Sequence, residues 1–408
     1  MVKVLTGSTT LTQAAPPKVV LPVLCLCSFS VIFNLRVLGP VLVDISRDLN
    51  VTIAKAGSLA VAYSLPFTIA ALFVAPLSDR FGRRLMMLLG ISTLALAAFG
   101  AVLAPSFEAL FLARVLAGLG GAVLQPATMA SVGDYFPYNE RGRAMSWVIG
   151  ATTMSTVVGV PVGTFLAGIF SWRWIFALLG IILLIATVIV IILFPDGNRT
   201  TTTDTKGLDE YKSNFKRVLR EPSAIATLIS TCLFGMFWHG WNTFSGAFFI
   251  QTFSLSTKEL APIIVLQGSG TFTGSYLGGV LSDRIGKKNT MSIGLLLGGI
   301  IITLLTNLTF SLWLTLALMV LMSINAGIRF TSENALATEQ VPDARGTMMA
   351  MDASTLQLGS VLGSSAGSLM IGSFSSYSPL GFAFGTFSLL SSVATRFFVR
   401  EKIADPPS

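Results

Sequence analysis

Residues 77–84 read LSDRFGRR and residues 281–288 read LSDRIGKK, so one pattern occurs twice at an offset of 204 positions. The same offset relates four further pairs of positions: Arg141-Gly142 to Arg345-Gly346, Gly159 to Gly363, and Gly163 to Gly367. Agreement at one offset in separate segments indicates an internal repeat. The sequence therefore predicts two homologous halves.

Between and around these motifs the chain is strongly apolar. It is 53% hydrophobic and 11% charged, whereas a soluble domain carries about 25% charged residues. Most apolar blocks are about 20 residues long, the length of a helix that crosses a bilayer. The alternation of apolar and polar residues that a transmembrane β-barrel needs is absent. The composition predicts an all-α membrane protein.

The apolar blocks predict twelve transmembrane helices in two pseudo-symmetric six-helix bundles, an N-terminal bundle of residues 19–194 and a C-terminal bundle of residues 223–395. We expect the helices at 19–43, 54–78, 85–105, 107–133, 143–170, 173–194, 223–250, 260–281, 290–310, 312–334, 346–373 and 377–395. A polar central loop at 195–222 joins the bundles, with tails at 1–18 and 396–408. An even number of helices per half gives both halves the same orientation in the membrane.

The distribution of Lys and Arg predicts the topology. If the N-terminus is cytoplasmic, twenty basic residues fall on the cytoplasmic side and four on the opposite side. This is the positive-inside bias of membrane proteins. The tails and the central loop are therefore expected in the cytoplasm, and the membrane is expected to be a bacterial-type cytoplasmic (inner) membrane. The net charge of +8 follows from this topology, so we expect no nucleic-acid partner.

The residue types of each repeated loop predict a tight connection between two helices. Asp and Arg end one helix, Gly permits a tight reversal, and a basic pair begins the next helix. The loop resembles the signature loop of the major facilitator superfamily, although Ala75 stands where the pattern usually has Gly and the second copy keeps Gly279. The resemblance implies gating residues in these loops, with two acidic residues on helices nearby as salt-bridge partners: Asp79, Arg80, Gly82, Arg83, Arg84, Asp134, Asp283, Arg284, Gly286, Lys287 and Glu339.

Other motifs narrow the resemblance. They are Arg114-x-x-x-Gly118-x-Gly120-Gly121, Gly159-Val160-Pro161-Val162-Gly163, Ser171 to Phe176 (SWRWIF) and Gly39-Pro40-x-x-x-Asp44-Ile45. Together they resemble the twelve-helix drug:proton antiporter branch, which also holds sugar and metabolite exporters. The glycines Gly159 and Gly163, with Pro161 between them, match the motif of antiporters. They also belong to a stripe of small residues, which is sufficient to explain them as helix packing.

Charged residues inside the predicted helices are the strongest functional candidates, because a bilayer penalises each by about 2.5 to 3.5 kcal/mol. Such residues are expected to face the bundle interior. Glu333 lies one helical turn after Arg329. We expect Glu333 or Asp352 to take up and release a proton, with Arg329 adjusting its proton affinity and Arg114 resembling the coupling arginine of the family. The alternative is a structural Arg–carboxylate pair that never titrates.

The seventh predicted helix contains Trp238-His239-Gly240-Trp241-Asn242, with the sole histidine of the chain. His239 is a further proton-coupling candidate, with hydrogen-bonded packing as its alternative. Aromatic and amide side chains near the midplane suit an amphipathic ligand. The residues expected to line the substrate cavity are Asn34, Arg36, Gln125, Trp238, Trp241, Asn242, Gln267, Asn325 and Gln357.

The leading interpretation is a secondary transporter that works by alternating access, and specifically a proton-coupled efflux antiporter for drugs or amphipathic metabolites. Uptake or exchange of a small organic anion or sugar is the second interpretation, and a non-transporting membrane sensor is a weaker one. No catalytic constellation is evident, so we expect no enzyme. We also expect no cofactor and no metal, because Cys25, Cys27 and Cys232 lack ligand spacing. The expected partners are a small-molecule substrate, protons and the lipid bilayer, and we expect a monomer.

Overall fold

Helices account for nearly all of the secondary structure of this protein. The computed structural model describes residues 19–195, 205–374 and 376–401. For several of these residues, including 75–80 and 205–212, only the backbone is described. The predicted tail at 1–18 and residues 402–408 of the predicted tail at 396–408 lie outside the described residues. The described part of the chain contains no strand.

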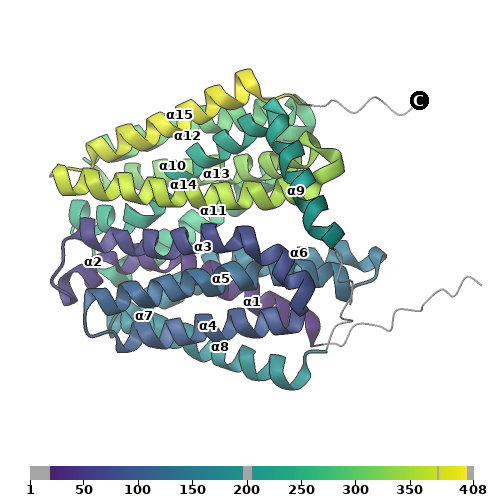
Figure 1. Ribbon diagram of the computed structural model, residues 1–408. Coiled ribbons are helices and arrows are strands. Elements are labelled where there is room, and N and C mark those ends of the chain that lie inside the picture. The colour runs from purple at the N-terminus through teal and green to yellow at the C-terminus, as the bar shows by residue number, and fades with distance from the viewer. Residues whose placement is uncertain (1–18, 196–204, 375, 402–408) are drawn as a thin grey trace, which may run out of the picture.

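The two halves form two adjacent helical bundles with their long helices roughly parallel (Figure 1). The N-terminal half contains α1 (Val20–Arg36), α2 (Leu38–Asp48), α3 (Ile53–Phe81), α4 (Arg83–Leu103), α5 (Phe107–Tyr135), α6 (Tyr138–Met154), a π-helical turn (Ser155–Gly159), α7 (Val160–Ile169) and α8 (Arg173–Leu193). The C-terminal half contains α10 (Pro222–Phe253), α11 (Thr257–Ile285), α12 (Lys287–Asn307), α13 (Leu312–Gln340), α14 (Arg345–Ser373) and α15 (Ser378–Phe398). The prediction of twelve spanning helices is confirmed in this architecture.

Two of the predicted helices are interrupted rather than continuous. The first breaks at Val37, where α1 and α2 meet at an angle of 49°. Pro40 follows this break and has no N–H to donate to the carbonyl of Arg36, one turn earlier. The fifth contains the π-helical turn between α6 and α7. Pro161 likewise cannot donate to the carbonyl of Val157, so the helix widens ahead of it.

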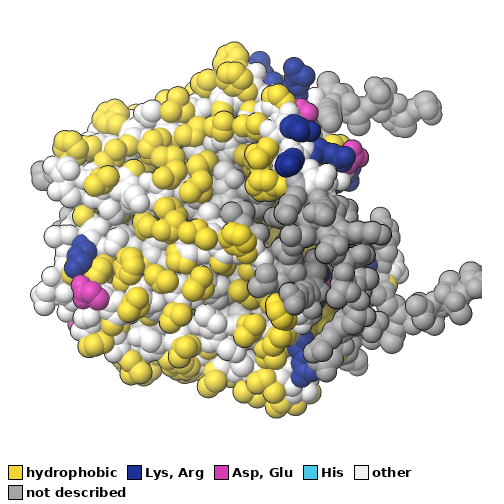
Figure 2. Space-filling model, viewed as in Figure 1, with side chains coloured by type: hydrophobic (Ala, Val, Ile, Leu, Met, Phe, Trp, Pro, Cys, Tyr) yellow, Lys and Arg dark blue, Asp and Glu magenta, His cyan; other side chains and the backbone are white. Residues whose placement is uncertain are grey.

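Length and composition qualify eight described helices as membrane spans, or nine when the bent pair α1–α2 counts as one. The remaining three, α11, α14 and α15, have 29, 29 and 21 residues, which is long enough to cross a bilayer. They are richer in Gly, Ser and Thr than the others. Figure 2 shows the consequence at the surface: apolar side chains cover the middle of the visible face, and charged side chains gather toward its ends.

The central segment 195–222 is not simply a loop, as its polarity predicted. It contains α9 (Thr205–Arg220), which runs across one end of the molecule in Figure 1. Val218 is fully buried against α10 and α14, and the Arg217 guanidinium lies 3.6 Å from the Asp343 carboxylate. The apolar side of a short amphipathic helix is thus anchored on the C-terminal half. We call this end of the molecule the α9 end and the opposite end, which holds Asp48 and Ser254, the far end.

The glycine stripes pack helices inside each half. A Cβ on Gly159 would lie 2.6 Å from the Phe29 ring of α1, and one on Gly163 would lie 2.5 Å from Ile175 of α8. A Cβ on Gly359 would lie 2.8 Å from Cα of Gly235, so α14 and α10 are in backbone contact. Close approach through small residues is the usual means of holding membrane helices together.

The described contacts between the halves lie toward the far end. Ser64 of α3 and Ser360 of α14 place their hydroxyl oxygens 3.0 Å apart, and Thr257 donates to Asp44 over 2.6 Å. A Cβ on Gly246 would lie 2.5 Å from the carbonyl oxygen of Gly39. In this conformation the far-end half of the interface is therefore closed.

Candidate functional site

Four side chains from three helices form a buried ionic cluster in the C-terminal half. Arg329 and Glu333 come from α13, Asp352 from α14 and Thr231 from α10. The Nη2 group of Arg329 donates to Oε1 of Glu333, and Nη1 lies against Oε2. The charged members are 1%, 3% and 6% exposed, in the order Arg329, Glu333 and Asp352. We call these four residues the acid cluster.

The acid cluster depends on the backbone contact between α10 and α14. The spacing of Arg329 and Glu333 puts them on one face of α13, but Asp352 reaches the cluster from another helix. The glycine contact of Gly235 with Gly359 brings α14 close enough for Asp352 Oδ1 to lie 2.7 Å from Thr231 Oγ1. Thr231 Oγ1 is also hydrogen-bonded to Glu333 Oε1. Thr231 thus connects the two carboxyl groups.

Aromatic rings link the acid cluster to the other half of the protein. The Arg329 guanidinium lies 3.7 Å from the centre of the Phe234 ring. Phe234 stacks on Trp238 with ring centres 6.2 Å apart. The guanidinium of Arg36, at the end of α1, lies 5.7 Å from the Trp238 ring. Cation–π contacts hold desolvated guanidinium groups at about 2 kcal/mol each, so the rings stabilise one arginine from each half.

The N-terminal half has its own buried arginine, but without a carboxylate. Arg114 of α5 is 2% exposed. Its Nη1 donates to the Asn34 backbone oxygen over 3.1 Å and to Asn34 Oδ1 over 2.5 Å. Its guanidinium lies 4.7 Å from the Tyr63 ring. Within the described residues no ion pair of Arg114 is found, so its charge is balanced by dipoles and a ring.

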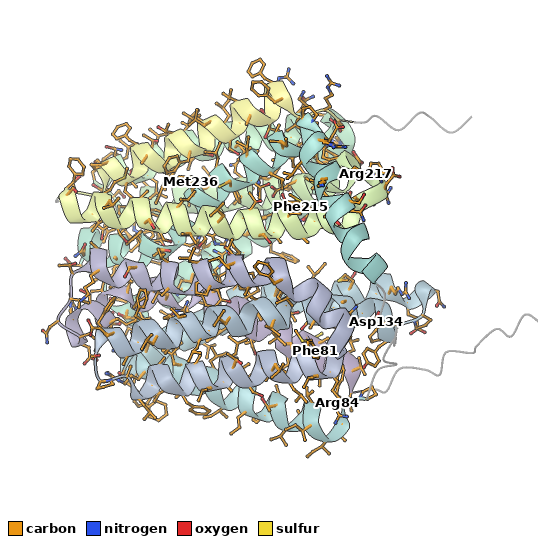
Figure 3. All side chains as sticks on the ribbon, in the orientation of Figure 1. Phe81, Arg84, Asp134, Phe215, Arg217 and Met236 are labelled. Atoms are coloured by element: carbon orange, nitrogen blue, oxygen red, sulfur yellow. The ribbon has the colours of Figure 1, made fainter. Side chains whose placement is uncertain are left out.

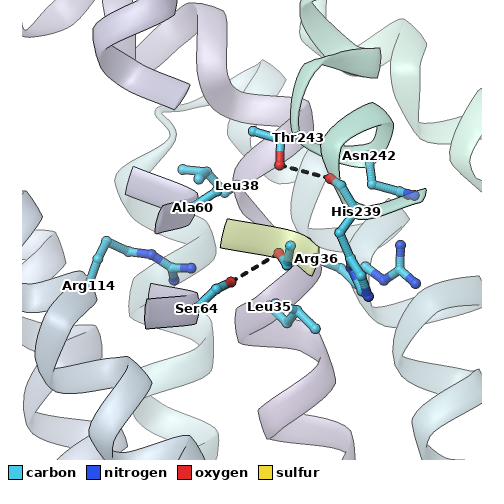
Figure 4. A pocket seen from close by; sticks show the side chains of 11 residues that line it. Leu35, Arg36, Leu38, Ala60, Ser64, Arg114, His239, Asn242 and Thr243 are labelled. Carbon is cyan, nitrogen blue, oxygen red and sulfur yellow. Dashed lines mark hydrogen bonds between the residues drawn. The ribbon is translucent and has the colours of Figure 1, made fainter. Parts of the chain in front are cut away.

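A small cavity of about 20 Å³ lies between the halves, enough for one water molecule. Arg36, Arg114 and Ser64 line it from the N-terminal half, and His239 and Asn242 line it from the C-terminal half (Figure 4). Nε2 of His239 is buried without a hydrogen-bond partner among the described residues. The cavity is therefore lined by polar groups from both halves, at the closed part of their interface.

The other predicted cavity residues occupy various places. Asn242 accepts from Gln267 Nε2 over 3.1 Å and donates to the Trp238 backbone oxygen over 2.6 Å. Trp241 is fully buried against Phe248 inside its own half. Asn325 Nδ2 donates to the Leu321 backbone oxygen of its own helix. Gln125 and Gln357 each bury an Oε1 atom that has no partner in the described structure.

The two repeated loops are built alike at the α9 end. Gly82 and Gly286 have φ angles of +84° and +86°, a region that favours glycine. Arg83 Nε donates to Asp134 over 2.7 Å, and Lys287 pairs with Glu339. Figure 3 labels Asp134 and Arg84 at this end, where Arg84 Nη2 donates to the Ile191 backbone oxygen over 2.7 Å. The side chains of Asp79 and Arg80 lie outside the described part, and those of Asp283 and Arg284 are exposed.

Sequence reasoning missed two contributors. Thr231 was not singled out, because a Thr in an apolar helix is common and its two acidic partners are 102 and 121 positions away. Glu401 accepts from the backbone N–H groups of Lys287 and Lys288 at 2.8 and 3.2 Å. A charge following the last apolar block was the available signal for Glu401, but it did not identify a partner.

Comparison with known proteins agrees with this architecture. The family model "Major Facilitator Superfamily" matches residues 24–273 and 249–408. The chain is 24% identical over 330 residues to the uncharacterized MFS-type transporter YwfA of Bacillus subtilis (strain 168), covering 80% of this chain and 79% of that protein. It is 32% identical over 247 residues to a chloramphenicol resistance protein of Streptomyces lividans, covering 59% of this chain and 61% of that protein.

Solved structures share the fold. A D-xylose-proton symporter superposes with a TM-score of 0.78 at 16% identity, covering 94% of this chain and 98% of the symporter. A bacterial homologue of the human lysosomal transporter Spinster, in an inward-facing and unoccupied conformation, superposes with a TM-score of 0.73 at 19% identity, covering 93% and 94% of the two chains. These similarities establish the fold. With the family model matching nearly the whole chain, this multi-pass membrane protein belongs to the Major Facilitator Superfamily of transporters.

Proposed function

We propose that this protein is a proton-coupled efflux antiporter, which exports a small amphipathic solute in exchange for protons by alternating access. The observation that carries the proposal is the acid cluster, where two carboxyl groups joined by Thr231 lie in a buried site with one guanidinium. Unbalanced charge is costly inside a membrane protein. A cluster with two acids and one cation is therefore suited to bind a proton in one conformation and release it in another.

The proposed direction rests on the antiporter-like motif and on the relatives. The Streptomyces lividans protein is named for chloramphenicol resistance, and a further relative is a quinolone resistance protein of Staphylococcus aureus. We propose that the α9 end faces the cytoplasm, because its loops carry most of the basic residues. The Arg83–Asp134 and Lys287–Glu339 pairs each lie within one half at this end, and we propose that they hold the repeated loops in position for gating. We propose a monomer as the working unit.

Reconstituted vesicles test the proton coupling. The purified protein is placed in liposomes that hold a pH-sensitive dye, and drugs or amphipathic metabolites are added one at a time. A transported solute should move protons in the opposite direction with the wild-type protein and with Asp343→Asn, which changes an exposed carboxylate outside the cluster. Asp352→Asn and Glu333→Gln should abolish the proton movement. Unchanged proton movement in both of these variants would remove the acid cluster from the proposal.

A second candidate function is transport of a small organic anion together with a proton. Arg36 and Arg114 favour it, because both line the cavity between the halves and neither has a described ion pair with a carboxylate. An anion bound there would add negative charge near the acid cluster and so favour a bound proton. Cells that express the protein should then accumulate a carboxylate such as benzoate when a proton gradient is present. Exclusion of the solute under the same gradient would instead support efflux.

A further inference from the structure

The Thr231 hydroxyl has more acceptors around it than it can serve. Its Oγ1 atom is hydrogen-bonded to Glu333 Oε1, lies 2.7 Å from Asp352 Oδ1 and lies 3.0 Å from the Thr227 backbone oxygen. A hydroxyl group has one hydrogen to donate and two lone pairs to accept with. A carboxylate oxygen that carries no proton can only accept. One hydroxyl cannot therefore satisfy two ionised carboxylates at once.

A proton on one carboxyl group resolves this arrangement. If both acids were ionised, one of the two short contacts would place lone pairs against each other in a buried site, where such contacts are costly. If one acid is protonated, it donates to Oγ1, and Thr231 donates to the other acid. Both contacts are then ordinary hydrogen bonds. The charge also balances, since one ionised carboxylate faces one guanidinium.

The position of Arg329 selects the protonated acid. Its two Nη groups contact both oxygens of Glu333, which stabilises the ionised form of that residue. Asp352 has Thr231 as its described hydrogen-bond partner. In this arrangement the protonated Asp352 carboxyl group donates to Thr231 Oγ1, and the Thr231 hydroxyl group donates to the Glu333 carboxylate.

We propose that Glu333 and Asp352 share one exchangeable proton through the Thr231 hydroxyl, and that Asp352 holds it in this conformation. The proton can pass along the chain without any co-reactant. Asp352 gives its hydrogen to Oγ1 while the former Thr231 hydrogen moves to Glu333, so two O–H bonds break and two form. Thr231 is thus a positioning residue that makes two acids act as a one-proton site. This inference rests on the proposed proton coupling. It predicts that the acid cluster carries one proton in each transport cycle.

The neighbouring charges are compatible with a single bound proton. Arg329 on α13 is part of the cluster, His239 follows Thr231 two turns later on α10, and Arg36 of α1 approaches through the Trp238 ring. On α15, Ser391 and Thr395 are uncharged and contact Ser230, the residue before Thr231. Loss of the proton would leave two carboxylates facing one paired guanidinium.

Infrared difference spectroscopy of the purified protein in lipid nanodiscs tests the proposal without any transported solute. The wild-type protein should show one buried carboxyl C=O band that disappears when the pH is raised. Asp352→Asn should remove this band. Glu333→Asp, which keeps an ionisable acid beside Arg329, should keep it. Thr231→Val, which has the same shape without the hydroxyl, should shift the band to the frequency of a carboxyl with no acceptor. It should also weaken proton binding about tenfold through the lost hydrogen bonds, whereas Thr231→Ser should match the wild type.

The outcomes separate the inference from the proposed function. A band that is identical in Thr231→Val and wild type, or one that is lost in Glu333→Asp and kept in Asp352→Asn, would overturn the shared-proton arrangement. So would equal shifts in Thr231→Ser and Thr231→Val, since the hydroxyl would then not be the cause. Absence of proton movement in vesicles for the wild-type protein would instead count against proton-coupled transport, even if the infrared bands behaved as expected.

Discussion

The two halves of the molecule treat a buried arginine in opposite ways. In the C-terminal half, Arg329 pairs with Glu333, and Asp352 joins them through Thr231. In the N-terminal half, Arg114 has an amide, a backbone oxygen and a tyrosine ring as its described partners. Both guanidinium groups are buried. The halves share a repeated motif and a similar order of helices, so this difference arises in their side chains and not in their architecture.

This difference determines where charge can change in the protein. An arginine stays protonated under all ordinary conditions, so the Arg114 site has a constant charge. The acid cluster contains groups that can lose or gain a proton, so its charge can vary. Proton binding is therefore expected in the C-terminal half, and electrostatic attraction of a negatively charged group is expected near Arg114.

The largest expected effect comes from removing each arginine. Arg329→Gln strands two buried carboxyl groups and should cost about 3–5 kcal/mol of stability. Arg114→Gln strands no carboxylate among the described residues and should cost about 1–2 kcal/mol. The Arg329→Gln loss should be greatest at high pH, where the stranded acids are ionised, and should shrink as they are protonated at low pH. Thermal unfolding in detergent at several pH values measures both variants. A loss in Arg329→Gln that is the same at every pH would contradict the comparison.

A smaller effect is expected from glycines that hold the helices together. Gly359→Ala would bring Cβ to within 2.8 Å of Gly235 Cα, and backbone atoms cannot move aside as a side chain can. Overpacking of this kind costs about 1–3 kcal/mol, and it should separate Asp352 from Thr231. Gly279→Ala is the matched control, because no atom lies within 4 Å of its added Cβ. Proton movement in vesicles should fall in Gly359→Ala and persist in Gly279→Ala. Equal behaviour of the two would show that the α10–α14 contact does not support the acid cluster.

The ring under each guanidinium offers a third comparison. Phe234 lies 3.7 Å from Arg329 and Tyr63 lies 4.7 Å from Arg114. Phe234→Leu should therefore lose about 2 kcal/mol of cation–π stabilisation, and Tyr63→Leu should lose less. Tyr63→Phe is a control that keeps the ring, and its hydroxyl has no described hydrogen-bond partner to lose. Thermal unfolding ranks the three variants. A larger loss in Tyr63→Leu than in Phe234→Leu would reverse the proposed order.

Sequence patterns predicted the features that depend on local spacing. The apolar blocks gave the helices to within several residues, and the repeat gave the two halves, because a bilayer forces a simple relation between length and structure. The Arg329–Glu333 pair followed from a spacing of four positions on one helix. Pro40 is the sequence signal for the bend after Arg36. The bend was not predicted, because the apolar pattern continues through this segment.

Features that depend on contacts between distant segments were not predictable in the same way. Thr231 meets Glu333 and Asp352 only because Gly235 and Gly359 let α10 and α14 touch. No periodicity in one helix contains that information. The α9 helix was missed for a related reason. Its sequence is polar on average, and it is its docking through Val218 on the C-terminal half that distinguishes it from a loop.

The smallest expected effect concerns the paired loops at the α9 end. The side chains of Lys287 and Glu339 are 30% and 28% exposed, whereas that of Asp134, the partner of Arg83, is 50% exposed. Exposed ion pairs contribute at most about 1 kcal/mol, and solvent and salt screen them. Glu339→Gln should therefore destabilise the protein slightly more than Asp134→Asn in low salt. Glu108→Gln, in a pair whose partners are 50% and 73% exposed, should have no measurable effect. Thermal unfolding at low and high salt tests this order, and identical salt dependence in all three variants would remove the distinction between the two loops.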